Sequence, residues 1–149
     1  MVTERVIVRA ILDFDGEVLL GKRVSGDEQG KYALIGGKPD AGETPEQAVV
    51  GEVQEEVGLE FVDPRLFTEE TNDKTKLGEF WHTLYYLGKV SGQLNLKADE
   101  VENVIYVGKK DLPSTDIAFT HKEVLEKYFE AKGGKKRLSI FCMADMLGT

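Results

Sequence analysis

Residues 37–59 read GKPDAGETPEQAVVGEVQEEVGL and contain the signals of one well-defined helix. Thr44 is suited to the N-cap, Pro45 to the first helical position, and Gln47 to the third position of a capping box. Gly58 is typical of the residue at which a helix stops. The sequence therefore predicts a helix that starts after Thr44 and ends at Gly58.

The predicted helix separates valines from glutamates when its residues are placed 100° apart. Its apolar arc carries Val49, Val50, Val53 and Val57. The opposite arc carries Glu52, Glu55 and Glu56. Like charges at these spacings cost about 0.2–0.5 kcal/mol per pair, and the helix macrodipole disfavours anions near the C-terminus.

Two interpretations account for this acidic face. Most charge runs on helices are solvated surfaces. A bound divalent cation would instead make both unfavourable interactions favourable, and Mg²⁺ prefers carboxylate oxygens combined with substrate phosphates. The glutamates follow the glycine pair Gly36-Gly37, so they also fit metal-assisted chemistry on a phosphate.

The net charge of the chain is concentrated in the same region. The 149 residues include 19 Lys and Arg against 27 Asp and Glu, which gives a formal net charge of −8. Eight acids and no Lys or Arg lie between Pro39 and Pro64, and the remaining chain has 19 acids and 19 bases. This balance argues against a nucleic acid as the main partner, because nucleic-acid binding requires a basic surface.

Composition predicts a single soluble domain over residues 1–149. With 41% hydrophobic and 31% charged residues, a chain of this length buries enough surface to fold unaided. The longest apolar stretch, near residues 138–147, is interrupted by Ser139 and Asp145 and is too short to span a membrane. The N-terminus does not resemble a secretory signal, and a single cysteine, Cys142, excludes an internal disulfide. We therefore expect a cytoplasmic protein that does not act at a membrane.

Strands are expected before the helix. Asp15-Gly16 is a hairpin turn signal between two β-type runs, at residues 4–14 and 17–24. A short apolar run at residues 31–35 then leads into Gly36-Gly37. We therefore expect a β-hairpin, followed by a strand that ends in a glycine loop.

Further strands and a second helix are expected after the first helix. The strands are predicted over residues 59–68, 79–90 and 104–107, with a polar loop over 69–78. Thr120 as N-cap, with Glu123 three residues later, predicts a helix that continues through Phe129. Residues 132–137 are expected to form a basic connector.

The spacing within residues 37–59 resembles the Nudix box at eight of its nine defining positions. Gly37 is followed after five residues by Glu43, and after seven more by the run GEVQEEVGL. The preceding strand and Gly36-Gly37-Lys38 also resemble this family. The resemblance implies an α+β Nudix fold, in which a mixed β-sheet is sandwiched between α-helices. It also implies hydrolysis of a nucleoside diphosphate linked to another group, with Mg²⁺ or Mn²⁺.

The same resemblance suggests the metal ligands and catalytic residues. The metal-binding glutamates of the family correspond to Glu52, Glu55 and Glu56, and Glu52 is one candidate for the general base. The carbonyl of Gly36 is a further candidate ligand. Some members add a glutamate from a distant loop, for which the candidates in this sequence are Glu100 and Glu102.

Three other side chains are candidates for substrate binding. Lys38 follows the glycines and could contact a phosphate, although it could equally be a solvated lysine. Arg23 ends the second expected strand and is a weaker candidate for a phosphate contact. Tyr85 lies in an aromatic strand beside Trp81 and could stack on a nucleobase. Core packing is the alternative for these aromatic residues.

One position departs from the family pattern, because Gly51 replaces the arginine of the box. A glycine inside a helix costs about 1 kcal/mol relative to alanine, and the missing guanidinium would pair with the box carboxylates. The departure has three explanations: a natural variant that still turns over, a domain that binds a nucleotide without hydrolysing it, or an engineered substitution. The intact glutamates favour a hydrolase.

The sequence leaves the substrate open. The short chain favours a nucleoside triphosphate, cleaved to a monophosphate and pyrophosphate. ADP-ribose or a nucleotide sugar is the first alternative, and dinucleoside polyphosphates and RNA ends also suit the fold. A non-catalytic nucleotide sensor is the alternative from another functional class. Homodimers are common in the resembling family, so a second copy of the chain is a candidate partner.

Overall fold

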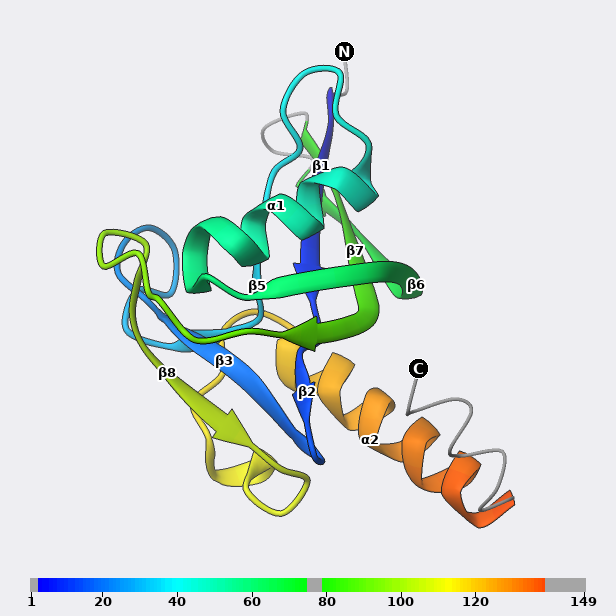
Figure 1. The fold of residues 1–149 in the computed structure, drawn as a ribbon. Helices are drawn as coiled ribbons and strands as arrows, with labels where there is room; N and C mark the ends of the chain where they lie inside the picture. Colours follow the sequence, from blue (N-terminus) through cyan, green and yellow to red (C-terminus); the bar gives the residue numbers. More distant parts are fainter. Residues whose placement is uncertain (1–2, 75–78, 139–149) are drawn as a thin grey trace.

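The computed structural model describes residues 3–74 and 79–138, which form two sheets and two helices (Figure 1). The first strands are β1 (Thr3–Ala10), β2 (Asp13–Phe14), β3 (Glu17–Arg23), β4 (Tyr32–Ala33) and β5 (Ile35–Gly37). The elements that follow are α1 (Pro45–Val57), β6 (Glu60–Lys74), β7 (Glu79–Ser91), β8 (Val101–Val107), the 3₁₀ turn η2 (Leu112–Ser114) and α2 (His121–Leu138). Cys142 and the apolar tail lie outside the described residues.

The larger sheet has the strand order β5-β1-β7-β6 and mixes strand directions. β1 runs parallel to β7, whereas β5 and β6 are antiparallel to their neighbours. The second sheet has the order β2-β3-β4, and β8 also pairs with β3. The predicted α+β class with a mixed sheet is therefore confirmed.

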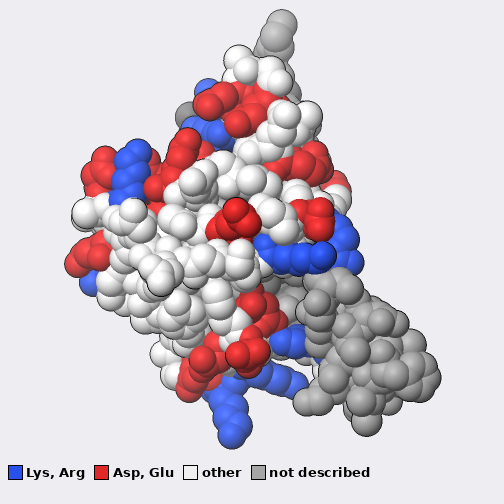
Figure 2. All heavy atoms as spheres, viewed as in Figure 1, with Lys and Arg blue, Asp and Glu red and all other residues white. Residues whose placement is uncertain are grey.

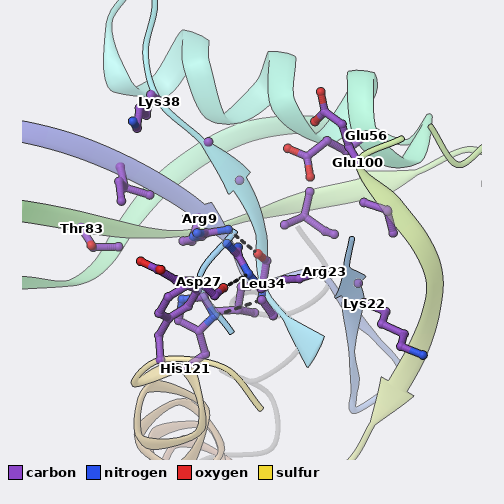
Figure 3. Close-up of a pocket in the computed structure, with 18 of the residues that line it drawn as sticks. Arg9, Lys22, Arg23, Asp27, Leu34, Lys38, Glu56, Thr83, Glu100 and His121 are labelled. Atoms are coloured by element: carbon purple, nitrogen blue, oxygen red, sulfur yellow. Dashed lines mark hydrogen bonds between the residues drawn. The ribbon is translucent and has the colours of Figure 1, made fainter. Parts of the chain in front are cut away.

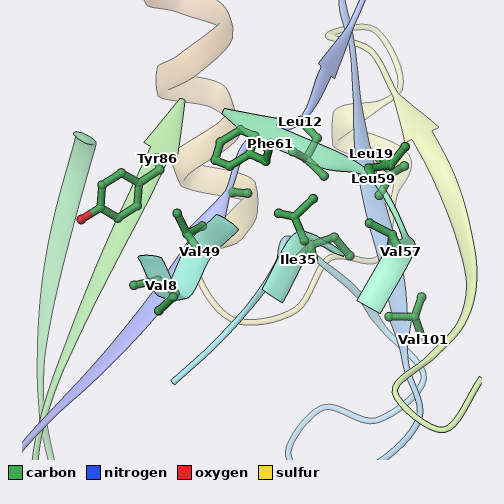
Figure 4. Close-up of a cluster of buried hydrophobic side chains, with 13 residues drawn as sticks. Val8, Leu12, Leu19, Ile35, Val49, Val57, Leu59, Phe61, Tyr86 and Val101 are labelled. Carbon is green, nitrogen blue, oxygen red and sulfur yellow. The ribbon is translucent and has the colours of Figure 1, made fainter. Parts of the chain in front are cut away.

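Helix α1 packs its valines against one face of the larger sheet (Figure 4). Val49, Val53 and Val57 are fully buried against Val8 of β1 and Phe61 of β6. Burial of each such side chain contributes about 1.5–3 kcal/mol. The predicted apolar arc is thus the face that holds α1 on the sheet, and α1 does not cover the opposite face of the sheet.

Helix α2 packs into a second apolar cluster. Val124, Leu125 and Phe129 are buried there with Leu20 of β3 and Tyr85 of β7. In the part of the chain that the structure describes, neither helix is both long and apolar enough to cross a membrane.

The predicted ends of α1 are confirmed. The backbone N–H of Gln47 donates to Thr44 Oγ1 at 3.1 Å, and the N–H of Thr44 donates to Gln47 Oε1 at 3.0 Å. Gly58 has a φ of 73°, in the left-handed region that favours glycine. Local sequence therefore sets both ends of the helix that carries the glutamates.

The predicted hairpin is only partly correct. The turn at Asp15-Gly16 joins β2 to β3, with φ values of 53° and 95°. The expected first arm is interrupted after Ala10, however, and β1 pairs with β5 and β7 in the other sheet. This strand therefore has sheet neighbours on both sides rather than one hairpin partner, and its Val8 and Ala10 are fully buried.

Two polar segments were wrongly predicted to be irregular. Residues 69–74 belong to β6, because their backbone groups pair with residues 79–84 of β7 at the sheet edge. Residues 132–137 belong to α2 rather than to a connector. Lys132 forms an ion pair with Asp13 Oδ2 at 2.6 Å, and Tyr128 donates to the same oxygen, which anchors the helix beyond its predicted end.

The N-terminus of α2 is joined to the second sheet through a buried histidine. The N–H of Leu34 donates to His121 Nδ1 at 3.1 Å, so that nitrogen carries no proton. His121 is 2% exposed, and burial, reinforced by the positive charges of Arg9 and Arg23, holds its pKa well below the usual value. The imidazole is therefore neutral in the folded protein.

This arrangement predicts a loss of stability in mild acid. Below a pH of about 6.5 the unfolded chain protonates His121 and the folded chain does not, so the free energy of unfolding falls, by at most about 1.4 kcal/mol per pH unit. Urea unfolding between pH 7.5 and 5.0 should therefore show a smaller decline for His121→Asn than for the wild type, because the Asn amide oxygen keeps the acceptor and does not titrate. Equal declines in the free energy of unfolding of the two proteins would contradict the neutral state of His121 in the folded protein.

Candidate active site

Two adjacent glycines in β5 make room for different neighbours, and one of them makes room for a glutamate of α1. A Cβ atom on Gly37 would lie 2.5 Å from the Glu52 carboxyl carbon, so the missing side chain is the space that this carboxylate occupies. A Cβ atom on Gly36 would lie 1.9 Å from the Val8 carbonyl oxygen in the neighbouring strand. The glycine pair therefore serves two purposes, strand packing at one residue and carboxylate placement at the next.

Three carboxylates gather at this edge. Oxygen atoms of Glu52, Glu56 and Glu100 lie within 4.8 Å of one another. Glu56 is 8% exposed, and its burial, a hydrogen bond with Glu52 and the charges of Glu52 and Glu100 raise its pKa to about 9. In the absence of a cation Glu56 is therefore protonated at neutral pH.

A loop docked on the C-terminal end of α1 supplies Glu100. The N–H of Asn95 donates to the Val57 carbonyl at 2.8 Å, and the N–H of Lys97 donates to the Glu56 carbonyl at 2.9 Å. The N–H of Glu100 then donates to the Lys97 carbonyl, which forms a turn directly before β8. These bonds satisfy carbonyls at the helix end and fix the third carboxylate beside the other two.

The other predicted metal ligands take different positions. Glu55 is exposed and lies outside the three-carboxylate group, although it shares the predicted acidic arc. Glu102 is also outside it and lies 3.9 Å from Lys22 Nζ. Gly36 lines the adjacent pocket. The structure thus brings together Glu52, Glu56 and Glu100 from the predicted set.

A pocket of about 720 Å³ opens beside the carboxylates (Figure 3). Its floor includes the side of β1 and β7 that α1 does not cover, and the start of α2 closes one end. Glu56 and Glu100 line it, and so do the three predicted substrate-binding residues, Lys38, Arg23 and Tyr85. Its volume is in the range that accommodates small-molecule ligands.

The predicted substrate-binding side chains have different surroundings within the pocket. Lys38 is exposed, with Nζ 5.2 Å from the centre of the Trp81 ring. The Arg23 guanidinium lies 4.7 Å from the Phe119 ring and donates to the Asp27 carbonyl. Tyr85 is 1% exposed, so its ring belongs to the core while its hydroxyl donates to Glu70.

Sequence reasoning missed Arg9, which lies in the middle of the pocket between Thr83 and Glu100 (Figure 3). Its Nη1 donates to the Leu34 carbonyl at 2.9 Å, but its buried Nε has no hydrogen-bond partner among the described residues. Burial and the charge of Arg23 lower the pKa of Arg9. A charged residue inside the apolar run VIVRAIL was the available signal, because unpaired arginines are rarely placed in central strands.

The outer surface has no comparable concentration of positive charge in the view of Figure 2. On the part of this face that the described residues form, Lys and Arg side chains are interspersed with Asp and Glu side chains. The basic residues that face one common space are those that line the pocket.

A comparison with family models matches residues 1–128 to the NUDIX domain. The chain belongs to the Nudix family. This membership explains the joint occurrence of the glycine pair, the capped helix and the glutamates at the edge of the sheet.

Individual Nudix relatives agree with this result. An ADP-ribose pyrophosphatase of Methanocaldococcus jannaschii is 32% identical over 87% of this chain and 75% of its own. Nucleoside triphosphatase NudI of an Enterobacter species is 29% identical over 82% and 99%, respectively. The crystal structure of a MutT NUDIX hydrolase from Burkholderia pseudomallei has 31% identity and a TM-score of 0.74, covering 83% of this chain and 97% of that one. The predicted Nudix fold and the predicted enzyme class, a Nudix pyrophosphohydrolase, are confirmed.

The two glycines of β5 predict separable defects. Gly37→Ala should displace the Glu52 side chain and lower kcat/KM at least tenfold, with little change in Tm, because its Cβ meets the end of a side chain. Gly36→Ala should instead lower the free energy of unfolding by about 1–3 kcal/mol or more, because its Cβ meets a backbone oxygen. Thermal unfolding and steady-state kinetics on both variants test this separation of catalytic and stability effects. Equal changes in Tm for the two variants would contradict it.

Gly51 predicts a gain from substitution. A Cβ atom there meets nothing within 4 Å, and the residue lies inside α1, so Gly51→Ala should raise the free energy of unfolding by about 1 kcal/mol. Gly51→Arg should give the same stabilisation and a higher kcat/KM, because the guanidinium pairs with the carboxylates of the site. The alanine variant separates helix propensity from this pairing. Unchanged melting temperature and turnover in Gly51→Arg would contradict the prediction.

Proposed function

We propose that this Nudix enzyme hydrolyses a nucleoside triphosphate to a nucleoside monophosphate and pyrophosphate, with Mg²⁺ or Mn²⁺ held by Glu52, Glu56 and Glu100. In this reaction water adds to phosphorus, the phosphoanhydride bond breaks, and pyrophosphate leaves. The observation that carries the proposal is that two members of the three-carboxylate group, Glu56 and Glu100, line the same pocket as a buried arginine whose Nε is unpaired among the described residues.

The chemistry of the three carboxylates fits a hard divalent cation. All of their candidate ligand atoms are oxygens, which are the ligands that Mg²⁺ and Mn²⁺ prefer. Glu56 is buried among like charges, so a proton neutralises it when no cation does. Cation binding would release that proton and remove the repulsion among the three side chains.

The cations in the wall of the pocket fit a chain of phosphates. Arg9, Lys22, Arg23 and Lys38 all line the same volume. Arg9 offers a donor that is already desolvated, so a phosphate oxygen would satisfy it without a further cost of burial. A small ligand with several adjacent negative charges suits this wall better than a neutral one.

The residues of the chain have complementary roles in the proposed reaction. When bound, a divalent cation neutralises phosphate charge and polarises the scissile bond. The Glu52 carboxylate, half-buried beside Gly37, accepts a proton from the attacking water. Arg9 and Arg23 hold phosphate oxygens and stabilise the charge that develops on the leaving group.

The relatives support two substrate classes. NudI, which is matched over nearly its full length, is named as a nucleoside triphosphatase, and this favours the proposed substrate. The Methanocaldococcus jannaschii relative is named as an ADP-ribose pyrophosphatase, which makes ADP-ribose the second candidate. Nucleoside triphosphates and ADP-ribose both contain the phosphoanhydride bond that the proposed site would cleave.

The proposal predicts that Glu56→Gln lowers turnover at least 100-fold, because the amide cannot replace a carboxylate ligand. The metal-free Tm should change little, because Gln resembles the protonated form of Glu56. Nucleoside triphosphates, ADP-ribose and nucleotide sugars are assayed for product release with Mg²⁺ or Mn²⁺. Faster turnover of ADP-ribose than of every triphosphate would replace the first candidate with the second.

Glu100 and Glu102 provide a matched pair that tests the third ligand. Glu100→Gln should lower kcat/KM at least tenfold and weaken the thermal stabilisation by Mn²⁺, because Glu100 belongs to the three-carboxylate group. Glu102→Gln should leave both within about twofold, because its carboxylate faces Lys22 instead. The reverse order would show that Glu102 completes the site.

A further inference from the structure

The end of the pocket farthest from the three carboxylates carries an acceptor, Glu70. It lies on β6 opposite Thr83 of β7, which is in turn opposite Ile7 of β1, and all three line the pocket. Gly37, which contacts Glu52, is on β5, three strand spacings from β6 and thus about 14 Å across the sheet. Thr83 marks this far end in Figure 3.

Two hydroxyl groups hold the Glu70 carboxylate in place. Tyr85 Oη and Thr120 Oγ1 each donate to Glu70 Oε1 at 2.7 Å. Neither bond uses Oε2, for which the described residues provide no hydrogen bond. The carboxylate is therefore oriented by one oxygen and keeps the other as an acceptor for a ligand.

The charge at this end is unsuited to a phosphate. In the described part of the chain, no Lys, Arg or His nitrogen lies within 4.0 Å of the Glu70 carboxylate, so this carboxylate has no close countercharge. A phosphate there would be repelled, whereas an N–H group would be attracted. In the order of the strands Arg9 of β1 lies between the carboxylates beyond β5 and Glu70 of β6, so the pocket has two chemically different regions on either side of Arg9.

We propose that Glu70 is a specificity-determining residue, which accepts a hydrogen bond from the amino group of a nucleobase. The inference rests on the proposed function, because it places the phosphates of the substrate beside Arg9 and the carboxylates. Phe119 precedes Thr120 in the chain and lines the same pocket, and its ring, which is 41% exposed, is of a kind on which a planar base can stack. Guanine, adenine and cytosine present an amino group, whereas uracil has none, and its N3–H is flanked by two carbonyl oxygens that a carboxylate repels.

Binding of nucleoside monophosphates without metal tests this inference independently of turnover. Calorimetry should show GMP, AMP and CMP binding at least tenfold more tightly than UMP. Glu70→Gln should abolish or reverse this preference, because the glutamine oxygen can still accept from Tyr85 and Thr120 while its amide donates to a carbonyl. Glu69→Gln is the matched control, since Glu69 pairs with His82 and does not line the pocket, and it should keep the wild-type preference.

A second variant, Thr120→Val, should weaken the preference without a change in charge, because it removes one of the groups that orient Glu70. Equal affinity for the four monophosphates, or a preference that Glu70→Gln leaves intact, would overturn the inference. A loss in Glu70→Gln that is the same for every base and larger for GMP than for dGMP would assign Glu70 to the ribose and overturn it as well. Failure of the proposed function is seen separately, as an absence of Glu56-dependent product release.

Discussion

The repulsion among Glu52, Glu56 and Glu100 is the constraint on which the rest of the site depends. Each carboxylate is brought to the same edge of the sheet by a different device: the glycine gap at Gly37, the packing of α1, and the loop docked on its C-terminal end. Hydrophobic burial of the α1 valines offsets the cost of this arrangement. The fold therefore holds together three groups that separate in the unfolded chain, and a cation or a proton is needed to neutralise them.

The features predicted correctly from the sequence are mainly those set by local chemistry. The capping box at Thr44 and the left-handed glycine at position 58 depend only on residues within one turn of each helix end. The Nudix resemblance likewise comes from a spacing within 23 residues. These signals need no knowledge of how distant strands pair, which is why they identified the helix and the family.

The features that the sequence could not reveal depend on contacts between distant residues. The helical wheel places Glu55 and Glu56 on one arc, but the position of α1 on the sheet buries Glu56 and leaves Glu55 exposed. Similarly, the sequence does not distinguish Glu100 from Glu102 as the additional metal ligand. Their positions differ because the loop before β8 bonds to α1 and β8 pairs with β3. Residues 69–74 are polar along the chain, yet their backbone groups find partners in β7.

The positions of the charged residues in the pocket follow the order of the strands in the larger sheet. The three-carboxylate group lies beyond β5, Arg9 lies on the inner strand β1, and Glu70 lies on the outer strand β6. Burial and the charge of Arg23 lower the pKa of Arg9, the charges of Glu56 and Glu52 partly offset this effect, and its Nε is unpaired among the described residues. The position of Arg9 on β1 therefore leaves one buried donor, its Nε, without a partner among the described residues, and such a donor favours an anionic ligand over water.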